Sequence, residues 1–414
     1  MKIYISGICG TGMGPLALMA KAAGHEVFGS DLAEGAISPE LVSAGIQFAV
    51  GPQDGEFLKK QLEDGGVDWF VHTSALAPDN AELLVAKQAG IKCSKRDELI
   101  ASLVSELGLK LVAVAGTHGK TTTTAMIVWA CQQMGVPAAY LVGTTLPFAA
   151  SGAYKPGDKY LIYEADEYDR NFLHFHPWLS VITTVSYDHP DIYPTPEDYA
   201  FAFETFERQS EQVIYGGEVN GLISLAGLLR REDATSAMAA MRTILPDAGK
   251  FTTDAKIAEV LNAFPGVGRR FERIAPGVYS DYGHHPEEIA ATVEMATEEA
   301  SLRGLSGVVM VYEPHQNTRQ HQVFAGYANA FEGVSHLYWL PTYLTREDPK
   351  LPVITPADFI ASLSNAEVAE AAECNDSLAT ALRQWRDNGY LVIFMTAGPA
   401  DGWFRQVFND KEVK

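Results

Sequence analysis

Apolar and polar positions alternate along the chain in blocks that predict a strand, then a helix, then another strand. Near the amino terminus the apolar run KIYISGI precedes GPLALMAKAAG, whose apolar residues recur at helical spacing, and HEVFGSD follows as the next apolar run. DWFVHTSAL, NAELLVAKQAG and IKCSKR repeat the pattern. This alternation predicts a parallel sheet with helices on both faces. We assign residues 1–107 to a first α/β domain.

A second block begins at KLVAVAGT, continues into the helical TTTTAMIVWACQQMG, and contains the later strands KYLIYEADE and LSVITTVSYDH. GLISLAGLLRRED, ATSAMAAMRTIL and DAKIAEVLNAF then predict helices, until Pro265, Gly266 and Gly268 interrupt the pattern. The third block has the strands GVYSDY, GVVMVYEP, HLYWLP and YLVIFMTAG. The expected fold is therefore α/β in three domains, 1–107, 108–265 and 266–414, each with a mostly parallel sheet flanked by helices.

Composition narrows the possible partners. The formal net charge of the 414 residues is −21, which argues against nucleic acid and anionic membranes as partners, because both require a basic face. No run of about 18 apolar residues predicts a membrane span, and the amino terminus lacks the pattern of a signal peptide. The four cysteines are dispersed and form no CxxC pair. These features predict a cytoplasmic protein.

A candidate phosphate-binding loop lies in AVAGTHGKTTTTAMIVWA, residues 113–130, where a buried strand becomes a helix. Gly119, Lys120 and Thr121 match the end of the G-x-x-x-x-G-K-[ST] motif, although Val114 stands where the first glycine would be. Backbone N–H groups at a helix start bind phosphate, a lysine can reach the β- and γ-phosphates, and a threonine hydroxyl can hold Mg²⁺. The alternative is an ordinary strand-to-helix turn with a surface lysine.

Two acidic strand ends in the second block could supply further metal ligands. IYEADEYD offers Glu164, Asp166, Glu167 and Asp169, and VSYDHPD offers Asp188, His189 and Asp191. If these strands are neighbours, Glu164 and His189 would lie beside Thr121. Histidine is not a preferred Mg²⁺ ligand, so His189 could instead hold a metal-bound water or orient a carboxylate. The alternative for each acidic run is a solvated loop.

A glycine-rich turn follows the first strand. Gly7, Gly10, Gly12 and Gly14 lie in SGICGTGMG, and Asp31 ends the second strand. The layout is similar to a dinucleotide-binding fingerprint, but its spacing is not G-x-G-x-x-G. The turn could bind a ligand that contains a diphosphate, or it could be only a tight connection between strand and helix. A nicotinamide-dependent dehydrogenase would explain this turn but not the loop at Lys120.

Together these stretches resemble the Mur ligases of peptidoglycan synthesis. GTHGKTTTT is similar to that family's ATP loop. EADEYDRNFLHFHP and VSYDHPDIYPT resemble the two motifs of the family's central domain. PGVGRRFE, YSDYGHHPEEIAAT and VYEPHQNTRQH resemble the carboxyl-terminal domain, and GICGTGMGPLALMAKAAGHEVFGSD resembles the UDP-binding start. Within the family, the motifs most resemble the branch that joins L-alanine to UDP-N-acetylmuramate. The rival branch joins the same sugar acid to a tripeptide.

The resemblance implies a Rossmann-like UDP-sugar-binding domain, a P-loop ATP-binding domain and a Rossmann-like carboxyl-terminal ligase domain, with ATP and Mg²⁺ as cofactors. ATP would phosphorylate the muramoyl carboxylate, and the amine of L-alanine would displace phosphate. The implied metal ligands are Thr121, Glu164 and His189. Catalytic roles fall to Lys120, Glu164, His189, His285 and Arg319. The implied ATP-binding residues are Gly116, Thr117, His118, Gly119, Lys120, Thr121, Thr122, Asn220, Arg269 and Asp281. Those for the sugar nucleotide and acceptor are Gly10, Thr11, Gly12, Asp31, Ser74 and His315.

The chain departs from the family pattern in the central domain. Family members carry extra strands before a His-Asn pair that contacts adenine, whereas QVIYGGEVNGLISLAG passes almost directly to the next helix. Val219 replaces the histidine and Asn220 remains. A non-catalytic relative that binds the sugar nucleotide is therefore an alternative. Arg269 could bind phosphate or form an interdomain salt bridge.

Overall fold

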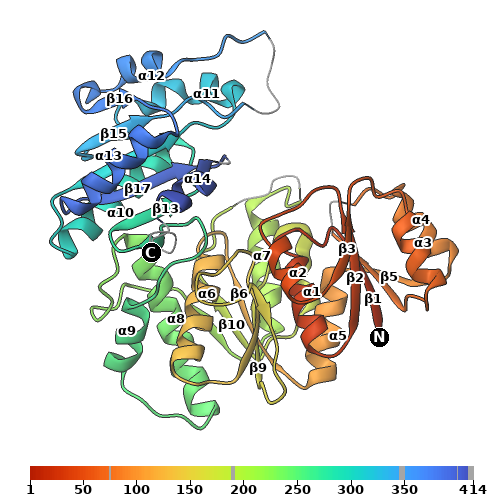
Figure 1. The fold of residues 1–414 in the computed structure, drawn as a ribbon. Helices are drawn as coiled ribbons and strands as arrows, with labels where there is room; N and C mark the ends of the chain where they lie inside the picture. Colours follow the sequence, from red (N-terminus) through yellow and green to blue (C-terminus); the bar gives the residue numbers. More distant parts are fainter. Residues whose placement is uncertain (74–75, 188–191, 345–349, 399, 409–414) are drawn as a thin grey trace, which may run out of the picture. The chain divides into compact units, whose positions relative to one another are not determined.

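The computed structural model describes residues 1–73, 76–187, 192–344, 350–398 and 400–408, which form two compact units (Figure 1). The first unit comprises Met1–Ser224 and Leu229–Phe264, and the second comprises Leu225–Leu228 and Pro265–Lys414. Three sheets lie in these units, two in the first and one in the second. The predicted fold class is confirmed, while the two predicted domain boundaries, at 107 and 265, remain predictions.

The amino-terminal sheet is five-stranded and fully parallel, in the order β3-β2-β1-β4-β5. Its strands are β1 (Lys2–Ser6), β2 (Glu26–Asp31), β3 (Gln47–Val50), β4 (Trp69–His72) and β5 (Lys92–Lys95). The helices are α1 (Gly14–Ala22), α2 (Ser38–Ser43), α3 (Glu56–Glu63), α4 (Ala81–Gln88) and α5 (Arg96–Leu107). Helices α1, α2 and α5 cover one face, and α3 and α4 cover the other (Figure 1).

Strand β1 shows how the sequence produces this layered arrangement. Successive side chains of a strand point to opposite faces, so Ile3 and Ile5 enter the core beneath α1 while Tyr4 enters the core beneath α3 and α4. All three are fully buried. A continuous apolar run is therefore what a central parallel strand requires.

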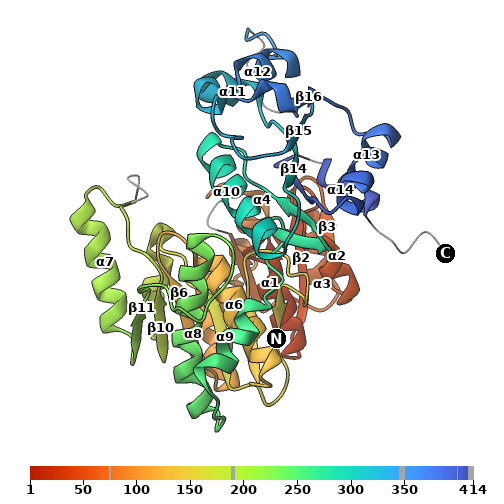
Figure 2. The ribbon, with the colours of Figure 1, turned by 90° about the vertical axis from the view of Figure 1, so that its left-hand side faces the viewer.

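The middle sheet is six-stranded, in the order β11-β10-β6-β9-β7-β8, and only the β7–β8 pair is antiparallel. Its strands are β6 (Lys110–Ala115), β7 (Ala138–Leu141), β8 (Gly152–Ala153), β9 (Tyr160–Glu164), β10 (Leu179–Ile182) and β11 (Val213–Tyr215). The helices are α6 (Lys120–Gln133), a 3-10 segment (Tyr168–His174), α7 (Pro196–Arg208), α8 (Leu228–Asp247) and α9 (Asp254–Asn262). Figure 2 shows α7 on the face opposite α6, α8 and α9.

One hydrophobic core joins the two sheets of the first unit. It runs from α1 and α5 of the amino-terminal sheet to β6, β9 and α7 of the middle sheet. The contact is tight, because a Cβ atom on Gly152 of β8 would lie 2.1 Å from the carbonyl oxygen of Pro15. Glu40 adds a polar link by accepting hydrogen bonds from the N–H and hydroxyl of Ser151 at 2.7 and 2.8 Å. The relative placement of the two sheets is therefore fixed by packing.

The second unit contains the third sheet, in the order β12-β13-β17-β14-β15-β16, with only β12–β13 antiparallel. Its strands are β12 (Glu272–Ala275), β13 (Val278–Asp281), β14 (Val308–Glu313), β15 (His336–Trp339), β16 (Ala369–Ala371) and β17 (Leu391–Thr396). The α-helices are α10 (Pro286–Leu302), α11 (Asn317–Val323), α12 (Pro356–Ser362), α13 (Asp376–Asp387) and α14 (Ala400–Val407). Short 3-10 segments span Phe324–Tyr327 and Ala366–Val368.

Two predicted elements differ from the structure. The strand predicted through LSVITTVSYDH ends at Ile182, and residues 183–187 after it form a loop that contacts the loop at Lys120. The helix predicted from Gly221 begins only at Leu228. The backbone before it is bonded to a side chain instead, because Asn262 accepts from the N–H of Ser224 at 2.8 Å and donates to the carbonyl of Leu222 at 2.9 Å.

No helix in the described part of the chain is long and apolar enough to cross a membrane.

A buried carboxylate links the strands of the amino-terminal sheet to α4. Glu82 is 1% exposed and accepts hydrogen bonds from the hydroxyls of Tyr4, Ser6 and Ser30 at 2.7, 2.8 and 2.7 Å. A buried charge is tolerated only when its acceptor sites are filled. Here three hydroxyl groups from two strands donate hydrogen bonds to the Glu82 carboxylate.

Replacing Glu82 by alanine is expected to destabilise the first unit by about 2–4 kcal/mol, because it leaves three buried hydroxyls without their acceptor. Urea unfolding followed by tryptophan fluorescence measures the change. The exposed Glu63 in α3 gives the matched control, Glu63→Ala, which should shift the midpoint little. Equal midpoints for the two variants would show that the network contributes no net stability.

Candidate active site

The loop between β6 and α6 has a backbone that only glycine adopts easily at two positions. Gly116 has a φ of 137° and Gly119 a φ of 81°. A Cβ atom on Gly116 would lie 2.2 Å from the hydroxyl oxygen of Thr183, and one on Gly119 would lie 2.2 Å from a carboxylate oxygen of Asp233. The turn and the close packing therefore both require glycine. The loop ends in the amino terminus of α6, where backbone N–H groups favour an anion.

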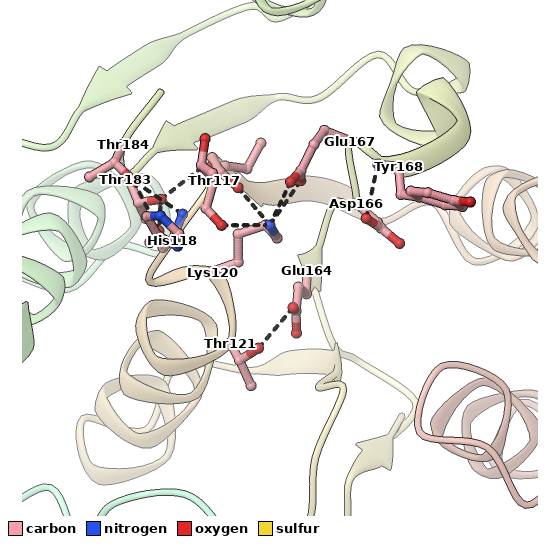
Figure 3. A network of polar contacts seen from close by, with 12 residues as sticks. Thr117, His118, Lys120, Thr121, Glu164, Asp166, Glu167, Tyr168, Thr183 and Thr184 are labelled. Carbon is pink, nitrogen blue, oxygen red and sulfur yellow. Dashed lines mark hydrogen bonds and ion pairs between the residues drawn. The ribbon is translucent and has the colours of Figure 1, made fainter. Parts of the chain in front are cut away.

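The segment after β10 holds this loop in place (Figure 3). The N–H of His118 donates to the Thr184 hydroxyl at 3.1 Å, and the N–H of Thr117 donates to the Thr184 carbonyl at 2.7 Å. The Thr117 hydroxyl accepts from the N–H of Ser186 at 2.9 Å and lies 2.8 Å from the hydroxyl of Tyr199. The side chains of Thr117 and His118 thus belong to a loop that is fixed by tertiary contacts.

Lys120 is the first residue of α6, and its side chain folds back over the loop. The ammonium donates to the carbonyls of Gly116 and Thr117 at 2.6 and 3.2 Å. It also lies 3.0 and 2.8 Å from the two carboxylate oxygens of Glu167, and only 15% of the Lys120 side chain is exposed. The cation is therefore fixed at the mouth of the loop rather than free on the surface.

Thr121 and Glu164 form the best candidate metal site. The Thr121 hydroxyl donates to one Glu164 oxygen at 2.8 Å (Figure 3). The other Glu164 oxygen is buried and makes no hydrogen bond with any residue that the structure describes. A buried carboxylate oxygen without a donor is costly unless a ligand satisfies it. A hydroxyl and a carboxylate are hard oxygen donors that fit Mg²⁺. Thr122, next along α6, is half-buried.

The sequence suggested that Glu164 and the residues after β10 follow neighbouring strands, but the two strands are not neighbours. Strand β6 lies between β9 and β10. The loop at Lys120 leaves the carboxyl end of this central strand, so acidic residues after β9 and polar residues after β10 flank it. His189 lies outside the described residues, as does Ser74, so their predicted roles stay predictions. Within the described ranges no group of three or more His, Cys, Asp or Glu is arranged to hold a metal.

Two acids at the loop were not singled out from the sequence. Glu167 pairs with Lys120, and Asp233 on α8 accepts from the Thr123 hydroxyl at 3.2 Å beside Gly119. Glu167 was one of four acids in a quoted segment, and nothing in the helical pattern around Asp233 marked it. Asn220 lies in the turn before α8, where its N–H donates to the Thr235 hydroxyl at 3.0 Å and its side chain accepts from Leu222.

The glycine turn of the amino-terminal sheet is closed by Asp31. One Asp31 oxygen accepts from the N–H of Cys9 and the other from that of Leu32, both at 2.8 Å. The carbonyl of Gly10 accepts from two N–H groups of the turn. A Cβ on Gly12 would lie 2.3 Å from a guanidinium nitrogen of Arg96. Thr11 is exposed at the tip. The candidate sugar-nucleotide turn therefore approaches an arginine that the sequence analysis missed.

In the second unit, the predicted residues gather at the carboxyl ends of β13, β14 and β17. Asp281 ends β13 and accepts from the N–H groups of Phe271 and Gly283 at 2.7 and 2.8 Å. Burial raises the pKa of Asp281 to about 6. His315 follows β14, with its ring 5.6 Å from that of Tyr343. Strand β17 lies between β13 and β14 and is parallel to both, so Asp281 and His315 lie at the same edge of the sheet.

Arg269, His285 and Arg319 complete this group. The Arg269 guanidinium donates to the carbonyls of Thr396 and Gly398 at 2.5 and 3.3 Å, so it is held at the end of β17. His285 caps α10, where its ring nitrogen accepts from the N–H of Glu287 at 3.4 Å. Arg319 lies on α11, and none of the described acids forms an ion pair with it. A guanidinium in that position suits a carboxylate or phosphate.

Comparison with known proteins decides the family. The model described as "Mur ligase family, catalytic domain" matches residues 2–107, and the one described as "Mur ligase middle domain" matches residues 114–216. A UDP-N-acetylmuramate–L-alanine ligase of Rubrobacter xylanophilus is 31% identical over 380 residues, which cover 80% of this chain and 82% of that protein. The chain belongs to the Mur ligase family. Mur ligases are ATP-dependent ligases, so the predicted enzyme class and ATP are confirmed.

Other relatives agree with this membership. A UDP-N-acetylmuramate–L-alanine ligase of Paenarthrobacter aurescens is 28% identical, covering 96% of this chain and 94% of that protein. Among solved structures, the UDP-N-acetylmuramate–alanine ligase of Thermotoga maritima has a TM-score of 0.74 at 22% identity and covers 98% of both chains. A murein peptide ligase of Psychrobacter arcticus has a TM-score of 0.57, also at 22% identity. At these identities the structural matches establish the Mur ligase fold.

Replacing Gly119 by alanine should weaken ATP binding about tenfold or more, because the added methyl meets both an unfavourable φ and the Asp233 carboxylate. Calorimetry with ATP measures the loss. Gly135, at the other end of α6, provides the control, since its φ is 65° but only Lys250, at 3.5 Å, lies near its Cβ position. Gly135→Ala should cost some stability and leave ATP affinity unchanged. If the two variants bind ATP equally, the loop conformation is not what binds the nucleotide.

Proposed function

We propose that this Mur ligase joins L-alanine to the carboxylate of UDP-N-acetylmuramate through an acyl phosphate, in peptidoglycan precursor synthesis in the cytoplasm, with ATP and Mg²⁺. The observation that carries the proposal is the grouping of Lys120, Thr121 and Glu164 at one glycine loop. The proposed substrates are those in the names of the relatives, which match most of the chain.

The side chains at the loop fit the activation of a carboxylate. A carboxylate is a poor electrophile, and a phosphoryl group gives it a leaving group. The loop N–H groups and the Lys120 ammonium would stabilise the charge on the transferred phosphoryl oxygens. Thr121 and Glu164 would hold Mg²⁺, which when bound neutralises phosphate charge. The buried Glu164 oxygen without a hydrogen bond supports that assignment.

Residues of the other sites would position the remaining groups. The turn closed by Asp31 would receive the diphosphate of the sugar nucleotide, with backbone N–H groups of Thr11 and Gly12 as donors beside Gly10. In the second unit, Arg319 would bind the carboxylate of alanine or the γ-phosphate. Asp281 would accept from the ribose of ATP, since each of its oxygens accepts only one backbone hydrogen bond.

Phosphate release by the purified protein tests the proposal. The assay contains saturating ATP, Mg²⁺ and UDP-N-acetylmuramate, and compares L-alanine, L-serine, glycine and the tripeptide L-alanyl-γ-D-glutamyl-meso-diaminopimelate. We expect release that depends on L-alanine and a product larger by one alanine residue in mass spectrometry. Release that depends on none of the four acceptors would refute the ligase proposal.

The tripeptide is the second candidate acceptor. The match to the murein peptide ligase from Psychrobacter arcticus covers 98% of both chains, so the two proteins share a fold. Greater turnover with the tripeptide than with L-alanine would assign the chain to that activity. Calorimetry separates the non-catalytic alternative, because such a relative would bind the sugar nucleotide without binding ATP.

A further inference from the structure

The Lys120 ammonium is enclosed by acceptors from two parts of the first unit. The loop supplies the carbonyls of Gly116 and Thr117, and the segment after β9 supplies both carboxylate oxygens of Glu167. Figure 3 shows the Glu167 carboxylate pointing at the ammonium, while Glu164 points at Thr121. The two glutamates of one short segment therefore serve different residues of the loop, and the Thr121–Glu164 assignment leaves Glu167 without a role.

Glu167 is itself held firmly. Its side chain is 1% exposed, and its carbonyl accepts from the buried Tyr193 hydroxyl at 2.6 Å and from the N–H of Arg170 at 3.0 Å. On its amino-terminal side, Asp166 accepts from the Arg96 guanidinium at 2.9 Å. The backbone that carries the Glu167 carboxylate is thus tied on both sides and cannot easily follow a moving lysine.

The backbone directly after Glu167 has an unfavourable conformation at two residues. Asp169 and Arg170 follow Glu167 with φ values of 54° and 57°, in the left-handed region that residues with a Cβ seldom adopt. The Asp169 carboxylate pairs with Lys95 there. Strain of this kind persists only where the surrounding contacts determine it, and it is concentrated at functional sites.

Stability alone does not account for the pair. Burial raises the pKa of Glu167 and the neighbouring Lys120 ammonium lowers it, so the desolvation of the carboxylate is opposed by the ion pair. A buried ion pair contributes little net stability relative to apolar side chains of similar size. What such a pair does provide is a fixed position for its charged groups.

We propose that Glu167 is a positioning residue for phosphoryl transfer, which fixes the Lys120 ammonium over the loop so that it meets the transferred phosphate in one geometry. The proposal rests on the ATP-dependent ligase function. In this role Glu167 acts through Lys120 and not directly on the sugar acid or the acceptor amine. A misplacement of about 1 Å in a catalytic group can cost about 100-fold in rate, so the anchor is expected to affect the chemical step strongly.

The proposal predicts that turnover and ATP affinity change differently. Without the carboxylate, the full ammonium charge is available to the triphosphate, so ATP binding is retained or becomes tighter. The ammonium is then held only by the loop carbonyls, so kcat falls. A residue that merely supports the fold would lower ATP affinity, kcat and thermal stability together.

The test compares Glu167→Gln and Glu167→Asp with the wild-type protein. Calorimetry gives the Kd of ATP, and phosphate release at saturating substrates gives kcat. For Glu167→Gln we expect kcat to fall about 10- to 100-fold while the Kd of ATP stays within about threefold or decreases. Glu167→Asp keeps the charge at a shorter reach and should be intermediate in kcat. Glu56→Gln is the matched control, because it removes an exposed pair with Lys59 at 2.7 Å.

Several outcomes would overturn the proposal. These are a Glu167→Gln kcat within twofold of wild type, or an increase in the Kd of ATP as large as the fall in kcat. If Glu167→Gln does not fold, as judged by thermal unfolding, Glu167→Asp decides the matter by the same criteria. A wild-type protein that releases no phosphate with any acceptor refutes the ligase function itself. An active wild type whose rate is insensitive to Glu167 refutes only the positioning role.

Discussion

Lys120→Ala is expected to lower phosphate release by about 1,000-fold or more. The ammonium is held at the loop mouth by two carbonyls within 3.2 Å. Removing it leaves only the backbone N–H groups and the proposed Mg²⁺ to stabilise the phosphoryl oxygens. Phosphate release in the presence of ATP, Mg²⁺, sugar nucleotide and L-alanine measures the loss. Turnover above about a tenth of the wild-type rate would show that the phosphates lie elsewhere.

The structure adds a condition that the sequence did not reveal. From the sequence, Lys120 lies in a loop and supports no core, so its removal should leave the fold intact. In the structure, however, it is paired with the buried Glu167 carboxylate. Lys120→Ala therefore buries an unpaired charge and should also lower stability by about 3 kcal/mol. The double variant Lys120→Ala with Glu167→Gln removes that charge. It should recover much of the stability and none of the activity, which separates the two effects.

Glu164→Gln has the second-largest expected effect, with kcat about 100-fold lower and a higher Mg²⁺ requirement. The amide keeps the size of the side chain and can still accept from Thr121, but it replaces one hard anionic oxygen by an NH₂ group that cannot bind a metal. A Mg²⁺ titration of phosphate release gives both quantities.

Glu211→Gln is the control for the metal-site variant. Glu211 is exposed and lies ahead of β11, at the opposite end of the sheet from the loop. Its replacement should leave the Mg²⁺ requirement unchanged. Equal Mg²⁺ curves for Glu164→Gln and the wild-type protein would mean that the metal is not held at the Thr121–Glu164 pair.

The local features of the site could be predicted from the sequence because they depend on neighbouring residues. The change from an apolar run to glycines, lysine and threonine places Lys120 and Thr121 at the start of a helix. Asp31 and Asp281 were expected at strand ends, and each ends a strand. The alternation of apolar segments was enough to predict parallel sheets, because continuous apolar runs are typical of strands that are buried on both faces of such a sheet.

What could not be predicted depends on contacts between distant segments. The local pattern of apolar residues does not determine the order of strands in a sheet. The strands β9 and β10 were therefore expected to be neighbours, although β6 separates them. The helix expected from Gly221 is replaced by turns because Asn262, on α9, satisfies backbone groups there. The same holds for Glu167, whose partner Lys120 lies 47 residues away.

The spacing of acids in residues 164–169 limits how this segment can vary in length. Glu164 and Glu167 reach the loop at the start of α6, whereas Asp166 and Asp169 reach the two basic residues at the start of α5. Inserting or deleting a single residue here would move the acids out of register with both sets of partners. Functional versions of this chain should therefore keep the number of residues between Glu164 and Asp169 unchanged.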